Sequence, residues 1–457
     1  MLYKSRKKKV HFIGVGGIGM SGIAEILLSS GYTVSGSDIA ESDTTRRLAS
    51  LGAIIHYGHK EENLNSSDVV VVSSAIDEKN PEIQAARRNK VPIIQRAEML
   101  GELMKMKTSI AIAGTHGKTS TTSMIATIVH HCDLDPTIII GGKVDALGGN
   151  AKLGKGDFLI AEADESDKSF LVLPSTIAIV TNIDNDHLNN YGTLENIKDA
   201  FVDFVNRIPF YGNAILCADD ENVKSILPRL KKPYTTYGLS PQADLQAKNL
   251  EFSSFGSDFE VWSGEKMLGK ARCNVPGKHN TLNALAALAT GMEIGLTFEQ
   301  ASKGLAQFKG VRRRFELKGE SGGVKVFDDY GHHPTEIKAT LAAARKAWKG
   351  RIVTCFQPHR YSRTQDCYQD FVKAFDDADV VYVADVYAAG EAPIPGISSE
   401  KLAEDISGQG HRSAQYIGAV KDVAEKIKGQ LQSGDLFLTL GAGSIYQAGE
   451  QLLKVLK

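Results

Sequence analysis

The order of apolar and polar positions predicts that strands and helices alternate along this chain. In residues 1–107, short apolar runs predict strands, and apolar positions repeated every three or four residues predict a helix. The four valines at 69–72 form an uninterrupted apolar run, which is typical of a strand buried on both faces. Strands that alternate with helices indicate a parallel sheet covered by helices. The predicted strands are 9–14, 32–37, 68–73 and 91–94, and the predicted helix is 18–30.

The same alternation recurs twice more, in residues 108–310 and in residues 311–457. The middle part also contains a more polar, strand-rich insertion at 244–275. Its predicted strands are 109–113, 158–161, 176–181 and 214–217, and its helices are 118–130 and 280–292. The last part has predicted strands at 323–328, 351–356, 380–384 and 435–440 and a helix at 334–346. We therefore predict an α/β protein with three domains in series, bounded as 1–107, 108–310 and 311–457.

Composition excludes several classes of protein. Of the 457 residues, 53 are Lys or Arg and 54 are Asp or Glu, so the net charge of −1 argues against a nucleic-acid-binding protein. No run reaches the about 18 apolar residues of a membrane span. The basic residues near the N-terminus precede a glycine-studded stretch, which is unlike a secretion signal. Five scattered cysteines without a Cys-x-x-Cys pair indicate neither a disulfide framework nor a zinc site, and we expect a cytoplasmic protein.

The first motif that suggests chemistry is a glycine loop between the first predicted strand and helix. Glycines let the backbone approach a diphosphate, whose charge the N–H groups of the helix N-terminus stabilise. An acidic residue at the end of the next strand often binds a ribose. NAD, FAD and UDP-sugars all remain open as ligands, and a glycine turn needed only for packing is the structural alternative. The residues are Gly14, Gly16, Gly17, Gly19 and, at the strand end, Asp38.

A second phosphate-binding motif, GTHGKTS, occupies residues 114–120 after another predicted strand. Backbone N–H groups of such a loop surround phosphates, Lys118 can reach the terminal phosphates, and the hydroxyl of Thr119 or Ser120 can bind Mg²⁺. The motif departs from the full P-loop pattern, since position 112 is Ile. We predict that the central domain resembles P-loop ATPases and has a mostly parallel sheet, with Rossmann-like domains on either side.

Polar side chains follow several other predicted strands. One group is acidic (Glu162, Asp164, Glu165 and Asp167), and another, at 182–187, ends in His187. Alone, an acidic loop is usually a solvated surface. The carboxyl ends of parallel strands meet at one edge of a sheet, so we expect both groups near the phosphate loop. In the last domain, the segments 328–334 and 357–363 also follow strands and contain histidines and arginines suited to bind a carboxylate or phosphate.

Together these motifs resemble the Mur ligase family, whose members form amide bonds in peptidoglycan precursor synthesis at the expense of ATP. The resemblance covers essentially the whole chain. The loop at 114–119 is similar to the family's ATP loop, including the missing first glycine. The stretches GVGGIGMSG at 14–22, DDYGHHPTE at 328–336 and PHRYSRT at 358–364 resemble those members that attach L-alanine to the lactyl carboxylate of UDP-N-acetylmuramate.

The resemblance implies an ATP-dependent acid–amino acid ligase that works through an acyl phosphate, with ATP, UDP-N-acetylmuramate and L-alanine as its small-molecule partners. It implies two Mg²⁺ ions, one held by Thr119 and Glu162 and the other by Glu162 and His187. The implied catalytic residues are Lys118, Glu162, His187, His332, Arg360 and Arg363. The implied ATP-binding residues are Gly114, Thr115, His116, Gly117, Lys118, Thr119, Ser120, Asn280 and Asn283.

The resemblance also implies where the other two substrates bind. L-alanine is expected at Tyr330, His332, Arg360 and Arg363. The UDP-sugar is expected at Gly14, Gly16, Gly17, Ile18, Gly19, Asp38, Ser73, Ser74 and Gly142. Two alternatives stay open: a recycling ligase that adds a murein tripeptide to the same sugar nucleotide, and a nucleotide-sensing regulator without ligase activity. No nucleic acid or membrane partner is expected, and both a monomer and a homodimer remain open.

Overall fold

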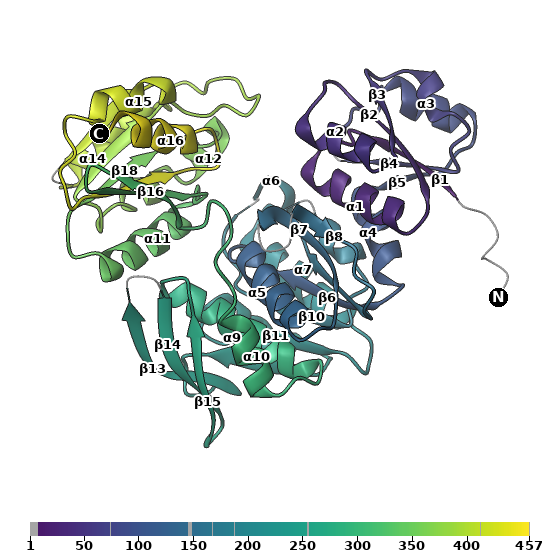
Figure 1. Ribbon diagram of the computed structural model, residues 1–457, viewed down its shortest axis with the longest axis horizontal. Coiled ribbons are helices and arrows are strands. Elements are labelled where there is room, and N and C mark those ends of the chain that lie inside the picture. The colour runs from purple at the N-terminus through teal and green to yellow at the C-terminus, as the bar shows by residue number, and fades with distance from the viewer. Residues whose placement is uncertain are drawn as a thin grey trace. The chain divides into compact units, whose positions relative to one another are not determined.

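The structure is a computed structural model of the 457-residue chain (Figure 1). It describes residues 8–73, 75–144, 149–166, 168–186, 188–253, 256–411 and 413–456. Three sheets follow one another along the chain, and each combines strands with helices, as the sequence predicted. Among the described residues, no helix is long and apolar enough to cross a membrane.

The first sheet has five parallel strands in the order β3-β2-β1-β4-β5. Its central strand β1 pairs with β2 on one side and with the valine strand β4 on the other, and Phe12 and Val71 are fully buried. The elements are β1 (Lys9–Ile13), α1 (Ile18–Ser29), β2 (Thr33–Asp38), α2 (Asp43–Ser50), β3 (Ile54–Tyr57), β4 (Val69–Val72), α3 (Pro81–Arg88), β5 (Ile93–Gln95) and α4 (Arg96–Met104).

The second sheet has ten strands in the order β15-β14-β13-β12-β11-β10-β6-β9-β7-β8. The pairs from β12 through β6 to β7 are parallel, whereas β8 is antiparallel to β7. Its strands are β6 (Thr108–Ala113), β7 (Thr137–Val144), β8 (Gly149–Lys152), β9 (Phe158–Glu162), β10 (Ile177–Val180), β11 (Asn213–Cys217), β12 (Tyr234–Gly238), β13 (Leu245–Ser253), β14 (Gly256–Ser263) and β15 (Lys266–Cys273). Its helices are α5 (Lys118–His131), η3 (Ser169–Val172), α6 (Leu188–Tyr191), α7 (Leu194–Asn206), α8 (Glu221–Ile226), α9 (Lys278–Glu293) and α10 (Phe298–Leu305).

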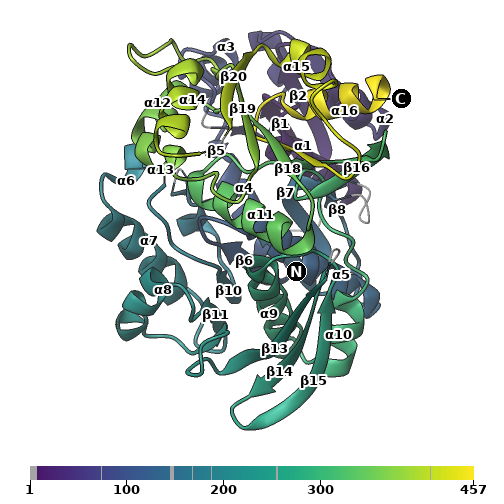
Figure 2. The same cartoon turned by 90° about the vertical axis from the view of Figure 1, so that its left-hand side faces the viewer.

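The third sheet has six strands in the order β16-β17-β21-β18-β19-β20, of which only β16 is antiparallel to its neighbour among the described residues. Two separate apolar clusters flank it, one with α11, α13 and α14 and the other with α15 and α16, so helices cover both faces (Figure 2). The elements are β16 (Glu316–Ser321), β17 (Val324–Asp329), α11 (Pro334–Ala347), β18 (Ile352–Phe356), α12 (Tyr361–Asp366), α13 (Tyr368–Val372), β19 (Val380–Ala384), α14 (Ser399–Gly408), β20 (Ala414–Gly418), α15 (Val420–Ile427), β21 (Leu436–Leu440) and α16 (Tyr446–Val455).

The chain divides into two compact units. The first contains residues 1–248, 260–271 and 282–308, and the second contains 249–259, 272–281 and 309–457. The first unit therefore contains the first sheet together with the glycine loop at 14–19 and the phosphate loop at 114–120, while the second unit contains the third sheet. The domain borders expected after residues 107 and 310 remain a prediction.

Three of the strands that were not predicted share a physical reason. β3, β16 and β20 lie at or near sheet edges, and their side chains are half-exposed or exposed at most positions. Such strands have no continuous apolar run, so their hydrophobic pattern is weak. β16 nevertheless had a local signal, because Gly322 and Gly323, both with positive φ, connect it to β17 as a two-residue hairpin turn.

Candidate active site

The phosphate loop connects β6 to α5 and has the geometry that its sequence predicted. Gly114 has a φ of +132° and Gly117 one of +83°, values that side-chain-bearing residues rarely adopt. A Cβ on Gly114 would lie 2.1 Å from the Thr181 hydroxyl oxygen, so this glycine is required for packing as well. Gly117 is the N-cap residue of α5, and no side chain caps this helix end. The first N–H groups of α5 are therefore available to phosphate oxygens.

Lys118 turns back onto its own loop. Its ammonium donates to the carbonyls of Gly114 (2.6 Å) and Thr115 (3.2 Å) and to the buried carboxylate of Glu165 (2.8 Å). Burial lowers the pKa of Lys118, but Glu165, Asp164 and Glu162 outweigh it, so the pKa is raised and the amine stays charged. All three donors of the ammonium are therefore engaged in the free protein, and a bound phosphate has to replace at least one partner.

The acidic strand end predicted as a metal site does lie beside the phosphate loop. Glu162 is the last residue of β9, and its carboxylate accepts a 2.8 Å hydrogen bond from the Thr119 hydroxyl in the first turn of α5. Asp164 follows two residues later, and its pKa is lowered, because Lys118 and hydrogen bonds from Ser166 outweigh the effect of burial. Hydroxyl and carboxylate oxygens are the donors that Mg²⁺ prefers.

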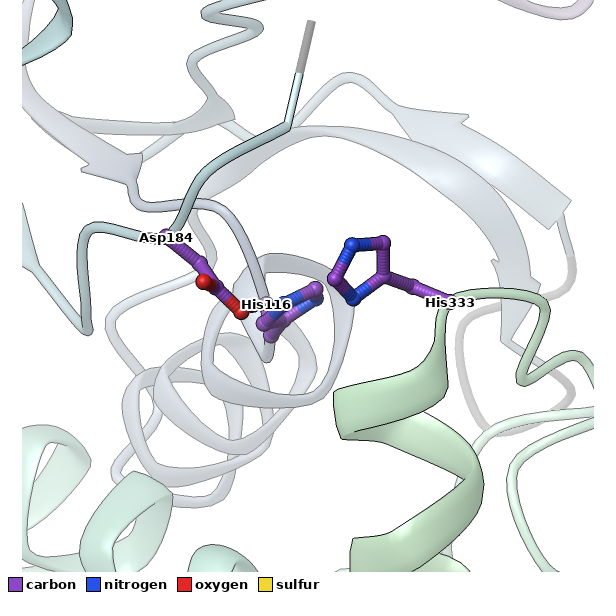
Figure 3. A group of neighbouring side chains, drawn as sticks. All are labelled: His116, Asp184 and His333. Atoms are coloured by element: carbon purple, nitrogen blue, oxygen red, sulfur yellow. Dashed lines mark hydrogen bonds and ion pairs between the residues drawn. The ribbon is translucent and has the colours of Figure 1, made fainter. Parts of the chain in front are cut away.

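His116 links the loop to the segment after β10. Its Nε2 lies 3.0 Å from a carboxylate oxygen of Asp184, and Figure 3 shows the two side chains next to each other. The backbone N–H of His116 donates to the Asn182 side chain (2.8 Å), and the N–H of Asp184 donates to the Thr115 hydroxyl (2.9 Å). The segments after β9 and β10 therefore both lie at the phosphate loop, as predicted.

The two asparagines expected to bind ATP lie one turn apart on α9. Asn283 is buried, and its side-chain oxygen lies 2.7 Å from the position of a Cβ on Gly117, so it borders the phosphate loop. Asn280 is also buried, and its amide donates to the carbonyl of Pro276 (2.8 Å). Ser120, the last residue of the predicted ATP loop, is buried in the first turn of α5.

The glycine loop after β1 is held by the end of β2. The N–H groups of Gly14 and Val15 donate to the carbonyl of Ser37 (2.8 and 3.0 Å). The N–H of Gly16 donates to the Asp38 carboxylate (2.8 Å), whose other oxygen accepts from the N–H of Ile39. The structure shows that Asp38 orders the loop, while its contact with a nucleotide stays a prediction. Gly17 caps α1 without a side-chain cap, which leaves N–H groups available to an anion.

Four of the predicted UDP-sugar and metal residues cannot be compared with the structure in full. Ser74 and His187 lie outside the described residues, as does Asp167 of the acidic group. The side chain of Ile18 and the surroundings of Gly142 are likewise not described. Ser73 directly follows β4, and its carbonyl accepts from the N–H of Ile76 (3.1 Å). The roles expected for these residues remain predictions.

The predicted amino-acid site forms a cluster at the ends of β17 and β18. The rings of Tyr330 and His332 lie edge to face with centroids 5.4 Å apart, and those of His332 and His359 are 5.9 Å apart. A guanidinium nitrogen of Arg363 lies 3.5 Å from Nδ1 of His359. Arg360 is exposed and has a φ of +69°, a strained conformation that its 2.9 Å hydrogen bond to the carbonyl of Tyr387 supports.

His332 is neutral near pH 7. Burial lowers its pKa to about 4, and Arg363 and Arg314 act in the same direction, while Glu336 opposes them. Nδ1 lies 3.1 Å from the carbonyl of Tyr330, which can only accept, so Nδ1 carries the proton and Nε2 has a lone pair. This is the protonation state that an acceptor of an amine proton requires.

Sequence reasoning did not identify several residues that the structure brings into these sites. Glu165 was seen only as part of an acidic stretch, yet it is the carboxylate that holds Lys118. Arg313 was not among the predicted site residues, yet it donates to Asp328 (3.0 Å) and stacks on Tyr330, with its guanidinium carbon 5.0 Å from the ring centroid. The spacing of residues along the sequence could not predict the contacts of Glu165 or Arg313, because they join residues that are distant in the sequence or on different elements.

Comparison with known proteins gives matches along nearly the whole chain. Three family models match: "Mur ligase family, catalytic domain" at residues 9–108, "Mur ligase middle domain" at 112–291 and "Mur ligase, glutamate ligase domain" at 313–443. The UDP-N-acetylmuramate–L-alanine ligase of Trichlorobacter lovleyi is 56% identical over 449 residues, and that of Geobacter sulfurreducens is 55% identical over 452, in each case over 98% of both chains.

Solved structures agree with these matches. The UDP-N-acetylmuramate-alanine ligase of Thermotoga maritima superposes with a TM-score of 0.82 at 31% identity, and a murein peptide ligase of Psychrobacter arcticus with 0.71 at 25%. Each comparison covers 98% of both chains. A phosphate loop on a mostly parallel sheet and a glycine loop on a parallel one define an α/β enzyme that binds nucleotides. The chain belongs to the Mur ligase family, which consists of ATP-dependent ligases, and the predicted three-domain α/β fold is confirmed.

Proposed function

We propose that this chain joins L-alanine to the lactyl carboxylate of UDP-N-acetylmuramate and converts ATP to ADP and phosphate. The observation that carries the proposal is the phosphate loop, in which the charged Lys118 stands beside Thr119 and Glu162. The curated relatives at 55–56% identity are named for this activity. The murein peptide ligase with a solved structure is only 25% identical, so the alanine ligase is favoured over the recycling ligase. A cytoplasmic location, in keeping with five free cysteines, belongs to the proposal.

The first chemical step activates the carboxylate, which is a poor acyl donor at neutral pH. A lactyl carboxylate oxygen forms a bond to the γ-phosphorus of ATP, the bond from that phosphorus to ADP breaks, and an acyl phosphate results. Lys118 would exchange one of its loop carbonyls or Glu165 for a phosphate oxygen and so stabilise the charge on the group in transfer. The backbone N–H groups of the loop and of the first turn of α5 would hold the other phosphates.

The residues at the loop fit Mg²⁺, because Thr119 and Glu162 present oxygen donors that already lie within hydrogen-bonding distance of each other. Thr119 and Glu162 would hold one ion, and Glu162 with His187 a second. When bound, Mg²⁺ would stabilise negative charge on the phosphate oxygens. Asp164, two residues after Glu162, adds a further carboxylate close to Lys118 of the phosphate loop, in keeping with a site for divalent cations.

The second step forms the amide. The alanine amine, as a free base, attacks the acyl carbon, and the tetrahedral intermediate expels phosphate as the nitrogen loses a proton. His332 is suited to accept that proton, because its Nε2 is unprotonated near pH 7. Arg360 and Arg363 would bind the alanine carboxylate, since a guanidinium offers two parallel donors to a carboxylate.

A phosphate-release assay over a panel of amine substrates tests the proposal. We expect phosphate only when ATP, UDP-N-acetylmuramate and L-alanine are all present, and mass spectrometry should detect the amide product. Turnover with a murein tripeptide but not with L-alanine would support the recycling reading. ATP binding without any amide product would support the regulator.

The assigned role of Lys118 has its own test. Lys118→Ala should lower turnover by at least about 100-fold, the size typical of a lost group that stabilises transition-state charge. Lys105→Ala is the control, because Lys105 is an exposed lysine at the end of α4 that pairs with Glu102. Thermal unfolding has to accompany the assay, since the variant leaves Glu165 buried without its ammonium partner. A folded Lys118→Ala enzyme with more than about a tenth of wild-type turnover would contradict the assignment.

A further inference from the structure

Arg96 lies against the glycine loop of the first domain without any sequence motif that points to it. It is the first residue of α4 and directly follows β5 at the carboxyl edge of the sheet. Its Nη1 and Cδ lie 3.0 and 3.1 Å from the position that a Cβ on Gly19 would occupy, and Gly19 is in the first turn of α1. The side chain of Arg96 therefore packs on the very turn that follows the predicted diphosphate loop.

The guanidinium of Arg96 has donors to spare. Within the described part of the chain, no hydrogen bond or ion pair engages it, although the side chain is half-buried. A cation at the first position of a helix is also electrostatically unfavourable, since helix N-termini carry partial positive charge. The N-terminus of α4 bears Arg96, and the N-terminus of α1, which has no side-chain cap, lies next to it. Positive charge thus accumulates at this point, and the nearby Asp164, whose pKa Arg96 helps to lower, makes no hydrogen bond or contact ion pair with the guanidinium.

The packing of α4 fixes the backbone position of Arg96. A capping box between Gln95 and Glu98 starts α4. Further along, α4 packs on η3, and a Cβ on Gly101 would come within 3.1 Å of the carbonyl of Val172. Because α4 is anchored at both ends, the backbone of Arg96 is held beside the loop, and only the side chain has to gain order when an anion binds.

We propose that Arg96 binds the diphosphate of the sugar nucleotide, together with the N–H groups of the glycine loop and α1. The inference rests on the proposed function, which places a nucleoside diphosphate sugar at this loop. A guanidinium can offer two donors to two phosphate oxygens at once, which a lysine cannot match. Gly19 then serves the site indirectly, because an added Cβ at this position would push the arginine away from the diphosphate.

Calorimetric titration of the full-length protein with UDP and with uridine tests this assignment. Arg96→Gln should weaken UDP binding by about 10- to 100-fold, the range for hydrogen bonds to a charged group, and should change uridine binding less than about twofold. Arg87→Gln is the matched control, because Arg87 is an exposed arginine of the same domain that pairs with Glu78. The control should bind UDP as the wild type does, and both variants should bind ADP with wild-type affinity.

Three results would overturn the assignment. UDP could bind Arg96→Gln as tightly as it binds the wild type, or UDP and uridine could lose affinity equally, which would indicate a distorted loop. Affinity could also fall for UDP-N-acetylmuramate but not for UDP, and then Arg96 would bind the lactyl carboxylate instead. A wild-type protein that binds no UDP and makes no amide would refute the proposed function itself. If Arg96→Gln binds UDP as the wild type does while the wild type forms the amide, only this inference would be refuted.

Discussion

Glu82 is a buried carboxylate, and its replacement should destabilise the first domain by an amount that depends on pH. It lies on α3, where the Ser37 hydroxyl (2.6 Å) and the Asn63 amide (2.5 Å) donate to it. Nδ1 of His59 lies 3.3 Å from the carboxylate, and Nε2 of His11 lies 3.7 Å from it. Ser37 also holds the glycine loop through its carbonyl, so the carboxylate supports the loop indirectly.

The magnitude follows from the pKa of Glu82. Burial, the largest single influence, would raise this pKa, but the nearby His11 and the hydrogen bonds from Ser37 and Asn63 outweigh it and lower the pKa from 4.5 to about 2. A carboxylate with a lowered pKa stabilises the fold fully above pH 4.5, and this stabilisation is lost as the pH falls through 2. At about 1.4 kcal/mol per pH unit, the change corresponds to about 3 kcal/mol of unfolding free energy at pH 7. Glu82→Gln, which cannot carry the charge, should lose about that amount.

Urea unfolding followed by hydrogen-exchange mass spectrometry can measure this loss locally, in peptides that contain β2 and α3. Glu61→Gln is the control, because Glu61 is an exposed neighbour that pairs with Arg88, and it should cost less than about 1 kcal/mol. The difference between wild type and Glu82→Gln should shrink by about half between pH 7 and pH 3. Equal stability at pH 7, or a difference that stays constant down to pH 3, would refute the reasoning.

Two further predictions concern the stability of the central domain and of the first domain. Lys107→Met should destabilise the central domain by about 2 to 4 kcal/mol in urea unfolding, because the Lys107 ammonium donates to the Thr137 hydroxyl and to two backbone carbonyls at 2.7–2.8 Å. A loss below about 0.5 kcal/mol, the range of ordinary surface changes, would contradict it. Gly16→Ala should destabilise the first domain by about 1 to 3 kcal/mol more than Gly17→Ala, because its methyl group would lie 2.8 Å from the Asp38 carboxylate, while the nearest atom to a Cβ on Gly17 is 3.4 Å away. Gly17→Ala should instead weaken UDP binding in calorimetry, and equal thermal stability of the two variants would count against the packing argument.

The sequence predicted those parts of the fold in which burial leaves a continuous pattern. The four valines of β4 lie in the middle of a parallel sheet, as an uninterrupted apolar run indicates, and the predicted strand at 380–384 coincides with β19. The polar edge strands β3 and β20 were missed, because their place in a sheet depends on a neighbour that is distant in the sequence. β7 and β8 were missed as well, although β7 contains three consecutive isoleucines.

For the site, the sequence predicted residues that chemistry confines to a motif. The lysine of the phosphate loop has to stand at a fixed position, so Lys118 could be identified from spacing alone, while the hydroxyl was limited to Thr119 or Ser120. The partners of these residues come from other strands. Nothing in the spacing of the acidic stretch distinguishes Glu165, which pairs with Lys118, from Glu162, which pairs with Thr119, since only the path of the chain after β9 decides this.

The glycines of the two loops show why motif reasoning was incomplete. From the sequence, these glycines were expected to let a phosphate approach the backbone closely. At four of them, however, a polar side chain from another element lies where a Cβ would be. At Gly16 that side chain is Asp38, at Gly19 Arg96, at Gly114 Thr181 and at Gly117 Asn283. Each missing Cβ thus admits a group that orders the loop or can itself contact the ligand. A substitution at such a glycine should therefore change stability, through the displaced side chain, and nucleotide binding, through the loop, in proportions that differ from one glycine to the next.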